Sequence, residues 1–96
     1  MPRNQKLTKV IAGRTVKAAT VEPGAVLVLF DDESRMKIKT AGPAAIPPGG
    51  KVKSVRETKT EFKIDFEDGS SATLRLADPG SSVAVRDKNN AVEYLG

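Results

Sequence analysis

The chain has 96 residues, with 16 basic and 12 acidic side chains and no cysteine, histidine or tryptophan. This length suits one domain with one modest core, and the missing residue types exclude disulfides, thiolate nucleophiles, imidazole bases and the common zinc ligands. No stretch approaches the ~20 apolar residues of a membrane span, and the start lacks the apolar segment of a secretory signal. We therefore expect a cytoplasmic, non-enzymatic protein without catalytic residues, metal, cofactor, membrane anchor or small-molecule substrate.

The net charge of +4 is concentrated near the start of the chain. The first 20 residues carry no acid and five bases, namely Arg3, Lys6, Lys9, Arg14 and Lys17. Residues 1–12 are predicted to form a basic N-terminal arm or strand. Such an arm either docks on phosphates or acidic surfaces or is a solvated terminus.

The first predicted strand covers residues 6–11. Leu7 and Ile11 fall on one face of an extended chain there, and Thr8 and Val10 fall on the other. Further alternating or continuous apolar runs predict strands over 15–21, 26–30, 36–40, 52–57, 62–66, 72–76, 82–86 and 91–95. The sequence therefore predicts an all-β chain of about eight or nine strands with little helix.

Turn residues separate these strands. Pro23-Gly24 predicts a type II turn, Asp68-Gly69 predicts a tight hairpin, and one of the asparagines at 89–90 is expected in the left-handed conformation. Glu33 stands where the second hairpin has Gly69. We expect a different or longer turn at Glu33, because glutamate resists the left-handed conformation that glycine accepts.

The chain reads as two copies of one unit, because residues 13–43 align without a gap on residues 49–79. The alignment contains 8 identities in 31 pairs. The identical pairs are Gly13/Gly49, Val16/Val52, Lys17/Lys53, Phe30/Phe66, Asp32/Asp68, Ser34/Ser70, Ala41/Ala77 and Pro43/Pro79. Each unit is expected to be a three-stranded meander, and the two units to share one core across a pseudo-twofold axis. A proline-rich connection, 44–48, and a C-terminal hairpin, 80–96, complete a single domain, 1–96.

The two copies differ on the outward positions of their middle strands. Lys63 and Asp65 suit a solvated face, whereas Leu27 and Leu29 make the first copy's strand apolar on both sides. The cover for these leucines is either the connection around Ile46, the N-terminal strand or a second molecule. Leu27, Leu29 and Ile46 are thus the candidate protein-interface residues, and a homodimer is one possible partner.

Outward basic residues form a second candidate site. Strand alternation directs Lys17, Lys53, Lys39 and Arg75 outward from equivalent places in the two copies. The full set of candidate nucleic-acid contacts is Lys6, Lys9, Arg14, Lys17, Lys37, Lys39, Lys53 and Arg75. With few aromatics for base stacking, binding would be weak, sequence-independent and salt-dependent; the alternative is a surface merely solvated by lysines.

Two other features have a structural and a functional interpretation. The acidic tips Asp31-Asp32-Glu33 and Glu67-Asp68 are ordinary turn chemistry or oxygen ligands for a hard cation, although neither matches an EF-hand loop. Tyr94 either closes the core with its hydroxyl at the rim or takes part in binding.

The alternating strand 62–66, the turn Glu67-Asp68-Gly69 and the strand ending at Leu76 resemble the hairpin of SH3-like small barrels of the Tudor and KOW type. The segment Gly49-Gly50-Lys51-Val52-Lys53 is similar to the opening strand of such barrels. The resemblance covers about 30 residues per copy and implies a binding module for nucleic acid, methylated side chains or proteins. Methyl-lysine readers of this type use an aromatic cage, and a chain with one tyrosine and no tryptophan supplies no cage residues.

The sequence thus predicts a single barrel or barrel-like sandwich of SH3-like character, built from two meanders. The predicted function is a non-enzymatic binding module with a protein-interaction or assembly role. Weak nucleic-acid binding is the alternative.

Overall fold

The computed structural model describes residues 2–42, 44–78 and 82–96. Within these ranges one helix precedes eight strands, all paired antiparallel. Their bounds are α1 (Gln5–Ile11), β1 (Val16–Glu22), β2 (Ala25–Phe30), β3 (Arg35–Lys39), β4 (Val52–Glu57), β5 (Glu61–Phe66), β6 (Ser71–Arg75), β7 (Val83–Arg86) and β8 (Val92–Leu95). One sheet has the order β1-β2-β3-β7-β8 and the other the order β4-β5-β6. The mostly β character expected from the sequence is confirmed.

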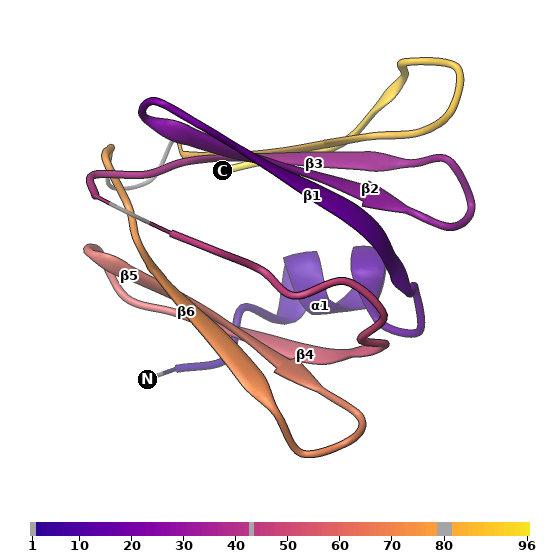
Figure 1. Ribbon diagram of the computed structural model, residues 1–96, viewed down its shortest axis with the longest axis horizontal. Helices are drawn as coiled ribbons and strands as arrows, with labels where there is room; N and C mark the ends of the chain where they lie inside the picture. Colours follow the sequence, from indigo (N-terminus) through magenta and orange to yellow (C-terminus); the bar gives the residue numbers. More distant parts are fainter. Residues whose placement is uncertain (1, 43, 79–81) are drawn as a thin grey trace.

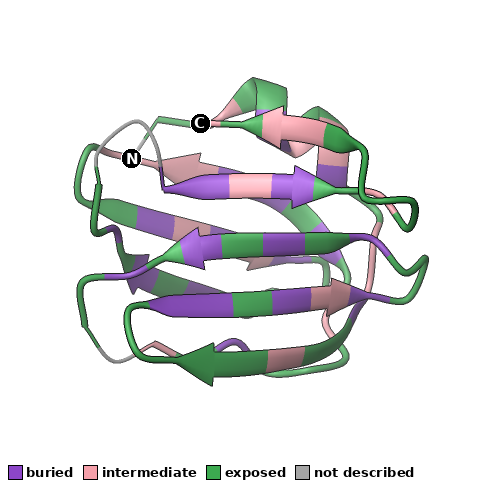
Figure 2. Ribbon diagram, turned by 90° about the horizontal axis from the view of Figure 1, so that it is seen from above, coloured by how far each residue is buried: buried purple, intermediate pink, exposed green. Residues whose placement is uncertain are grey.

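The two sheets lie face to face as two layers (Figure 1). Buried and exposed residues alternate along most of the strands (Figure 2), which directs one side of each sheet into a common core. Phe30, Met36 and Ile38 enter this core from one sheet, and Phe62 and Ile64 from the other, all without exposed surface. Among the described residues, only isolated bridges join the sheets, and the strands do not close into a barrel.

The predicted strand over residues 6–11 is wrong, because this segment is the helix α1. Asn4 caps the helix, with its side-chain oxygen accepting a hydrogen bond from the Leu7 amide at 3.0 Å. Leu7 and Ile11, four residues apart, lie on one helical face and are fully buried. The helix packs against β4 and β8, which belong to different sheets. It therefore closes one side of the space between the layers (Figure 1). No helix in the described ranges has the length and apolar character needed to cross a membrane.

The prediction of a different turn at Glu33 is also wrong. Glu33 adopts a φ of 71°, and Gly69 at the equivalent place adopts 90°. The amide of each residue donates to the carbonyl of the phenylalanine three positions earlier, Phe30 and Phe66. The aspartate that precedes each of these residues accepts a hydrogen bond from the backbone amide of the following serine. The distance is 2.9 Å from Ser34 to Asp32 and 2.8 Å from Ser70 to Asp68. These hydrogen bonds hold glutamate in a conformation that it resists in isolation.

The other turn predictions are confirmed where the chain is described. Gly24, between β1 and β2, has a φ of 77°, and Asn90, between β7 and β8, has a φ of 68°. The predicted unit boundaries at Pro43 and Pro79, and the first two residues of the predicted C-terminal hairpin, 80–81, lie outside the described residues.

Both meanders have the same strand register when residue numbers are shifted by 36. The β1–β2 pair is irregular between Val16 and Ala18, and the β4–β5 pair between Val52 and Ser54. Isolated bridges connect residues 15 with 51 and 40 with 76, so each bridge joins two positions that the shift makes equivalent. Main-chain contacts therefore link the meanders at both ends of their strands.

Candidate functional site

The most distinctive surface of the protein is the outer face of the five-stranded sheet around β3 and β7. Burial alternates along β3, so that Arg35, Lys37 and Lys39 are exposed while the residues between them are buried. The strand register places Leu27 of β2 beside Lys37, and Ala84 of β7 on its other side. We call this surface the β3–β7 face. Its residues are Leu27, Arg35, Lys37, Lys39, Ala84, Arg86 and Leu95.

Two hollows open on the β3–β7 face and share Lys37 and Ala84. The first has a volume of about 370 Å³ and is lined by Leu27, Arg35, Lys37, Ala84, Arg86 and Asn90. The second has a volume of about 380 Å³ and is lined by Lys37, Lys39, Ser82, Val83, Ala84, Leu95 and Gly96. Ala84 has a small side chain between the long side chains of its neighbours, which leaves space on both sides of Lys37.

Exposed apolar groups lie beside these bases. Leu27 is 37% exposed and Leu95 is 67% exposed. The register places both in one row that crosses β2, β3, β7 and β8 through Lys37 and Ala84. The face therefore combines apolar contact area with positive charge.

The positive charges of the β3–β7 face are not neutralised within the described chain. No ion pair there involves Arg35, Lys37, Lys39 or Arg86; the paired bases are Arg14, Lys51 and Arg56. By register, Glu22 faces Ala25, which in turn faces Lys39. Glu22 of β1 is thus two strands, or about 10 Å, from Lys39 of β3. The bases of the β3–β7 face therefore give this surface a net positive charge.

The outer face of the three-stranded sheet differs in charge. Arg56 donates two hydrogen bonds to the Asp65 carboxylate, each 2.9 Å long. These bonds, supported by the charges of Arg56 and Lys63, lower the pKa of Asp65 below its ordinary value, although partial burial opposes them. Asp65, which occupies the position of Leu29 when residue numbers are shifted by 36, supplies an acid of a kind that the β3–β7 face lacks. The two meanders thus have similar backbones and different outer surfaces.

The predicted nucleic-acid contacts do not form one patch. Lys17 and Lys53 follow the bridge between positions 15 and 51, whereas Lys39 and Arg75 precede the bridge between positions 40 and 76. All four are exposed, as strand alternation predicted. The two pairs lie at opposite ends of the strands, because the register of β2 and β3 separates these ends. Lys37 and Lys39 belong to the β3–β7 face, and the predicted arm residues Lys6 and Lys9 lie on α1.

The predicted protein-interface residues also separate. Leu27 is on the β3–β7 face and Leu29, on the same strand, is half-buried, whereas Ile46 is 4% exposed and belongs to the core. Ile46 is therefore not part of an exposed surface with the leucines. Arg35, Ala84, Arg86 and Leu95 were not identified from the sequence, because their proximity depends on β7 pairing with β3.

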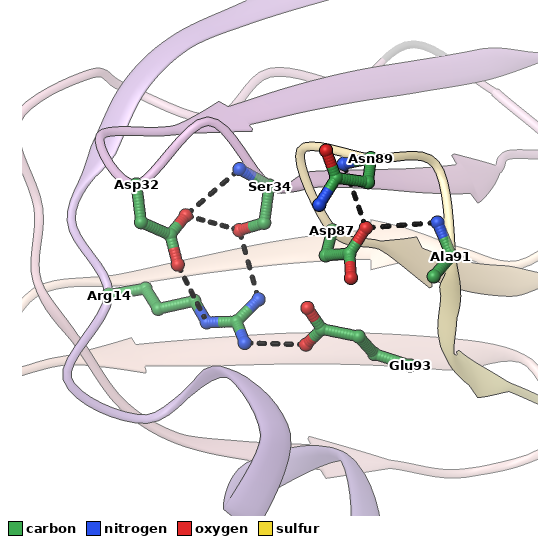
Figure 3. A network of polar contacts seen from close by, with 7 residues as sticks. All are labelled: Arg14, Asp32, Ser34, Asp87, Asn89, Ala91 and Glu93. Carbon is green, nitrogen blue, oxygen red and sulfur yellow. Dashed lines mark hydrogen bonds and ion pairs between the residues drawn. The ribbon is translucent and has the colours of Figure 1, made fainter.

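Arg14 was a predicted phosphate contact, but its guanidinium binds groups of the protein itself (Figure 3). It donates to the Ser34 hydroxyl at 2.9 Å and to the Glu93 carboxylate at 2.5 Å, and its Nε lies 3.4 Å from Asp32 Oδ2. Its side chain is only 19% exposed. These contacts tie the tip between β2 and β3 to the C-terminal strand β8, so Arg14 has a structural role here.

Asp32 belongs to the same network. Burial, the largest single influence, raises the pKa of Asp32, but the hydrogen bonds from the side chain and backbone of Ser34 and the charge of Arg14 together lower it below its ordinary value. The Ser70 hydroxyl and backbone likewise lower the pKa of Asp68 at the second tip. Neither tip forms a metal site of the usual kind. In the part of the chain that the structure describes, no group of three or more aspartates or glutamates lies close enough together to hold a metal ion.

These lowered pKa values predict a loss of stability in acid. A carboxyl whose pKa is lower in the folded than in the unfolded protein stabilises the fold above the unfolded pKa, about 3.9, and loses this effect as the pH falls through the folded pKa. Ser34→Ala removes the Ser34 hydroxyl from Asp32 and Arg14. We expect Ser34→Ala to lower the free energy of unfolding more at pH 6 than at pH 2.5.

The matched control is Ser70→Ala, which removes the equivalent hydroxyl at a tip without an arginine. Urea denaturation at several pH values would measure both variants. The Ser70→Ala effect should be smaller, since that tip is exposed. A Ser34→Ala effect that is independent of pH would contradict this role for Asp32.

Tyr94 lies at the rim of the core, half-buried, and its hydroxyl accepts a hydrogen bond from Asn4 Nδ2 at 2.9 Å. The same amide nitrogen donates to Glu57 of β4. These contacts agree with the interpretation of Tyr94 as a residue that closes the core. The tyrosine connects β8 with the start of α1.

The fold and the β3–β7 face together define a small two-sheet protein with an open, positively charged surface. Comparison of the chain with protein-family models, curated proteins and solved structures finds no match.

Proposed function

We propose that the protein is a non-enzymatic binding module that holds an acidic protein segment on its β3–β7 face. The observation that carries this proposal is the combination of four bases without an acidic partner and two apolar hollows on one sheet surface. Positive charge attracts an acidic partner and sets its orientation, while the exposed leucines supply contact area that leaves water on binding.

The charge of the face favours a partner other than a second copy of the chain. In a twofold dimer the same surface patch meets itself. Arg35, Lys37 and Lys39 of the two molecules would then face one another across a desolvated interface. Such like-charge contacts oppose association.

Nucleic acid is the second candidate ligand, favoured by the same cluster of bases. The aromatic residues argue for a protein instead. Phe30, Phe62 and Phe66 are buried, and the Tyr94 hydroxyl is hydrogen-bonded to Asn4. The β3–β7 face therefore has no aromatic side chain on which a base can stack.

We also propose that the two meanders arose from one duplicated unit and are related by pseudo-twofold symmetry, in the manner of paired SH3-like units. The identical register after a shift of 36 residues supports this origin. The outer surfaces would then have diverged, the first toward ligand binding and the second toward a charge-balanced, solvated face.

A charge reversal at the centre of the face tests the proposed function. Poly-L-glutamate titrated into the protein should shift backbone amide NMR signals of β2, β3 and β7, and should bind more weakly as salt rises. Lys37→Glu should weaken this binding by about five- to tenfold, because it exchanges an attractive for a repulsive exposed contact. The matched control Lys63→Glu makes the same change in net charge on the other sheet and should weaken binding less than about twofold.

Oligothymidylate with the same number of charges separates the two candidate ligands. Tighter binding of oligothymidylate than of poly-L-glutamate would favour the nucleic-acid function. Absence of binding by both polymers at low salt would contradict the proposed function.

A further inference from the structure

The bases and hollows of the β3–β7 face alternate along β3. Arg35 and Lys37 both line the first hollow, and Lys37 and Lys39 both line the second. The order along the strand is therefore base, hollow, base, hollow, base. Residues on one face of a strand repeat every two positions, so successive bases are about 6.5–7 Å apart at their Cα atoms.

An extended peptide has the same repeat. Its side chains alternate between two directions, and residues two apart are separated by the same 6.5–7 Å. Apolar side chains at two such positions would enter both hollows. Acidic residues between and beside them would then point away from the sheet, level with Arg35, Lys37 and Lys39, whose long side chains can extend past the peptide to reach them.

The chemistry of each hollow suits this alternation. Leu27 and Ala84 contribute apolar surface to the first hollow, and Ala84 and Leu95 to the second. The long stems of the lysines and the arginine can rise beside an apolar side chain while their charged ends reach the ligand backbone and its carboxylates. The bases and the small Ala84 thus line the same hollows.

We infer that the ligand is an extended segment in which acidic and apolar residues alternate, with at least the pattern acidic-apolar-acidic-apolar-acidic. This inference rests on the proposed function and adds the spacing of the charges to it. A ligand with the same residues in separate acidic and apolar blocks cannot fill both hollows and pair with all three bases of β3. The β3–β7 face therefore distinguishes ligands by the order of their residues as well as by their charge.

Two capped, fluorescently labelled peptides of identical composition test the inference. One has the core Glu-Leu-Glu-Leu-Glu and the other the core Glu-Glu-Glu-Leu-Leu. Fluorescence anisotropy at about 0.15 M salt, where exposed charge contacts are partly screened, should give at least about tenfold tighter binding of the alternating peptide. Equal affinity for the two peptides would overturn the inference, and so would failure of both to bind.

Variants in the hollows show whether the preference arises there. Ala84→Phe places a large ring between the hollows and should reduce the preference below about twofold. The control Thr73→Phe makes a similar change at an exposed position of β6 and should leave it intact. Leu95→Glu provides a second test at a residue already 67% exposed, with Val21→Glu, at a 56% exposed position of β1, as its control. If the control variants Thr73→Phe or Val21→Glu also lost the preference for the alternating peptide, the inference would be overturned.

The two proposals can fail separately. Equal binding of both peptides that is weakened by Lys37→Glu would leave acidic-partner binding in place and remove only the alternation. Failure of both peptides and of poly-L-glutamate to bind would remove both proposals.

Discussion

Replacement of Leu7 by alanine is expected to lower the free energy of unfolding by about 2–5 kcal/mol, the range for truncation of a buried leucine. Leu7 is fully buried on the face of α1 that packs against β4 and β8. The truncated side chain would leave a cavity between the helix and the two sheets, where the rigid strands limit collapse. Urea denaturation followed by circular dichroism measures the loss.

The control variant is Lys9→Ala, on the exposed side of α1. This change should alter the free energy of unfolding by less than about 0.5 kcal/mol, since no described side-chain hydrogen bond or ion pair involves Lys9. A Leu7→Ala effect below about 1 kcal/mol would show that α1 does not complete the core.

Gly50→Ala is expected to destabilise the protein by about 1–3 kcal/mol, as overpacking of a core does. A Cβ atom at Gly50 would lie 2.6 Å from Cδ1 and 2.9 Å from Cε1 of the Phe66 ring. Phe66 is 2% exposed, so its ring has little space to move. Gly50 also accepts, through its carbonyl, a 2.9 Å hydrogen bond from the Val16 amide, which limits movement of its own backbone.

Gly42→Ala is the control for this prediction. No heavy atom outside the neighbouring residues lies within 4 Å of a Cβ at Gly42, and its φ lies outside the left-handed region. Thermal or urea unfolding should show Gly42→Ala to be neutral or slightly stabilising. Equal stability of Gly50→Ala and the wild-type protein would contradict the predicted steric conflict.

Local sequence patterns predicted the strands well and the first element badly. Alternating or continuous apolar runs located all eight strands, because most of the strands direct apolar side chains into the common core. The same reasoning failed at residues 6–11, because Leu7 and Ile11 are four residues apart and this spacing fits a strand face as well as a helix face. Lys9 was the available signal: in a strand it would share the buried face of Leu7 and Ile11, whereas the helix exposes it.

The candidate site was only partly predictable. The difference between Leu27 and Lys63 led us to predict a cover over the outer side of the first middle strand, but Leu27 is 37% exposed. The sequence could not show that Ala84 and Arg86 lie beside Lys37 and Arg35, because β7 joins β3 across more than 40 residues of intervening chain. Arg14 was predicted as a phosphate contact for the same reason, since its partner Glu93 is distant in sequence.

The pairing of β7 with β3 has a consequence for the time at which the β3–β7 face is complete. Lys37 and Ala84, which border both hollows, are brought together only when a long intervening segment has been closed. Contacts of this separation form slowly during folding. Detachment of the β7–β8 hairpin from an otherwise folded molecule would remove Ala84, Arg86 and Leu95 together. Hydrogen-exchange protection of β7 would therefore report how much of the population has a complete β3–β7 face at any moment.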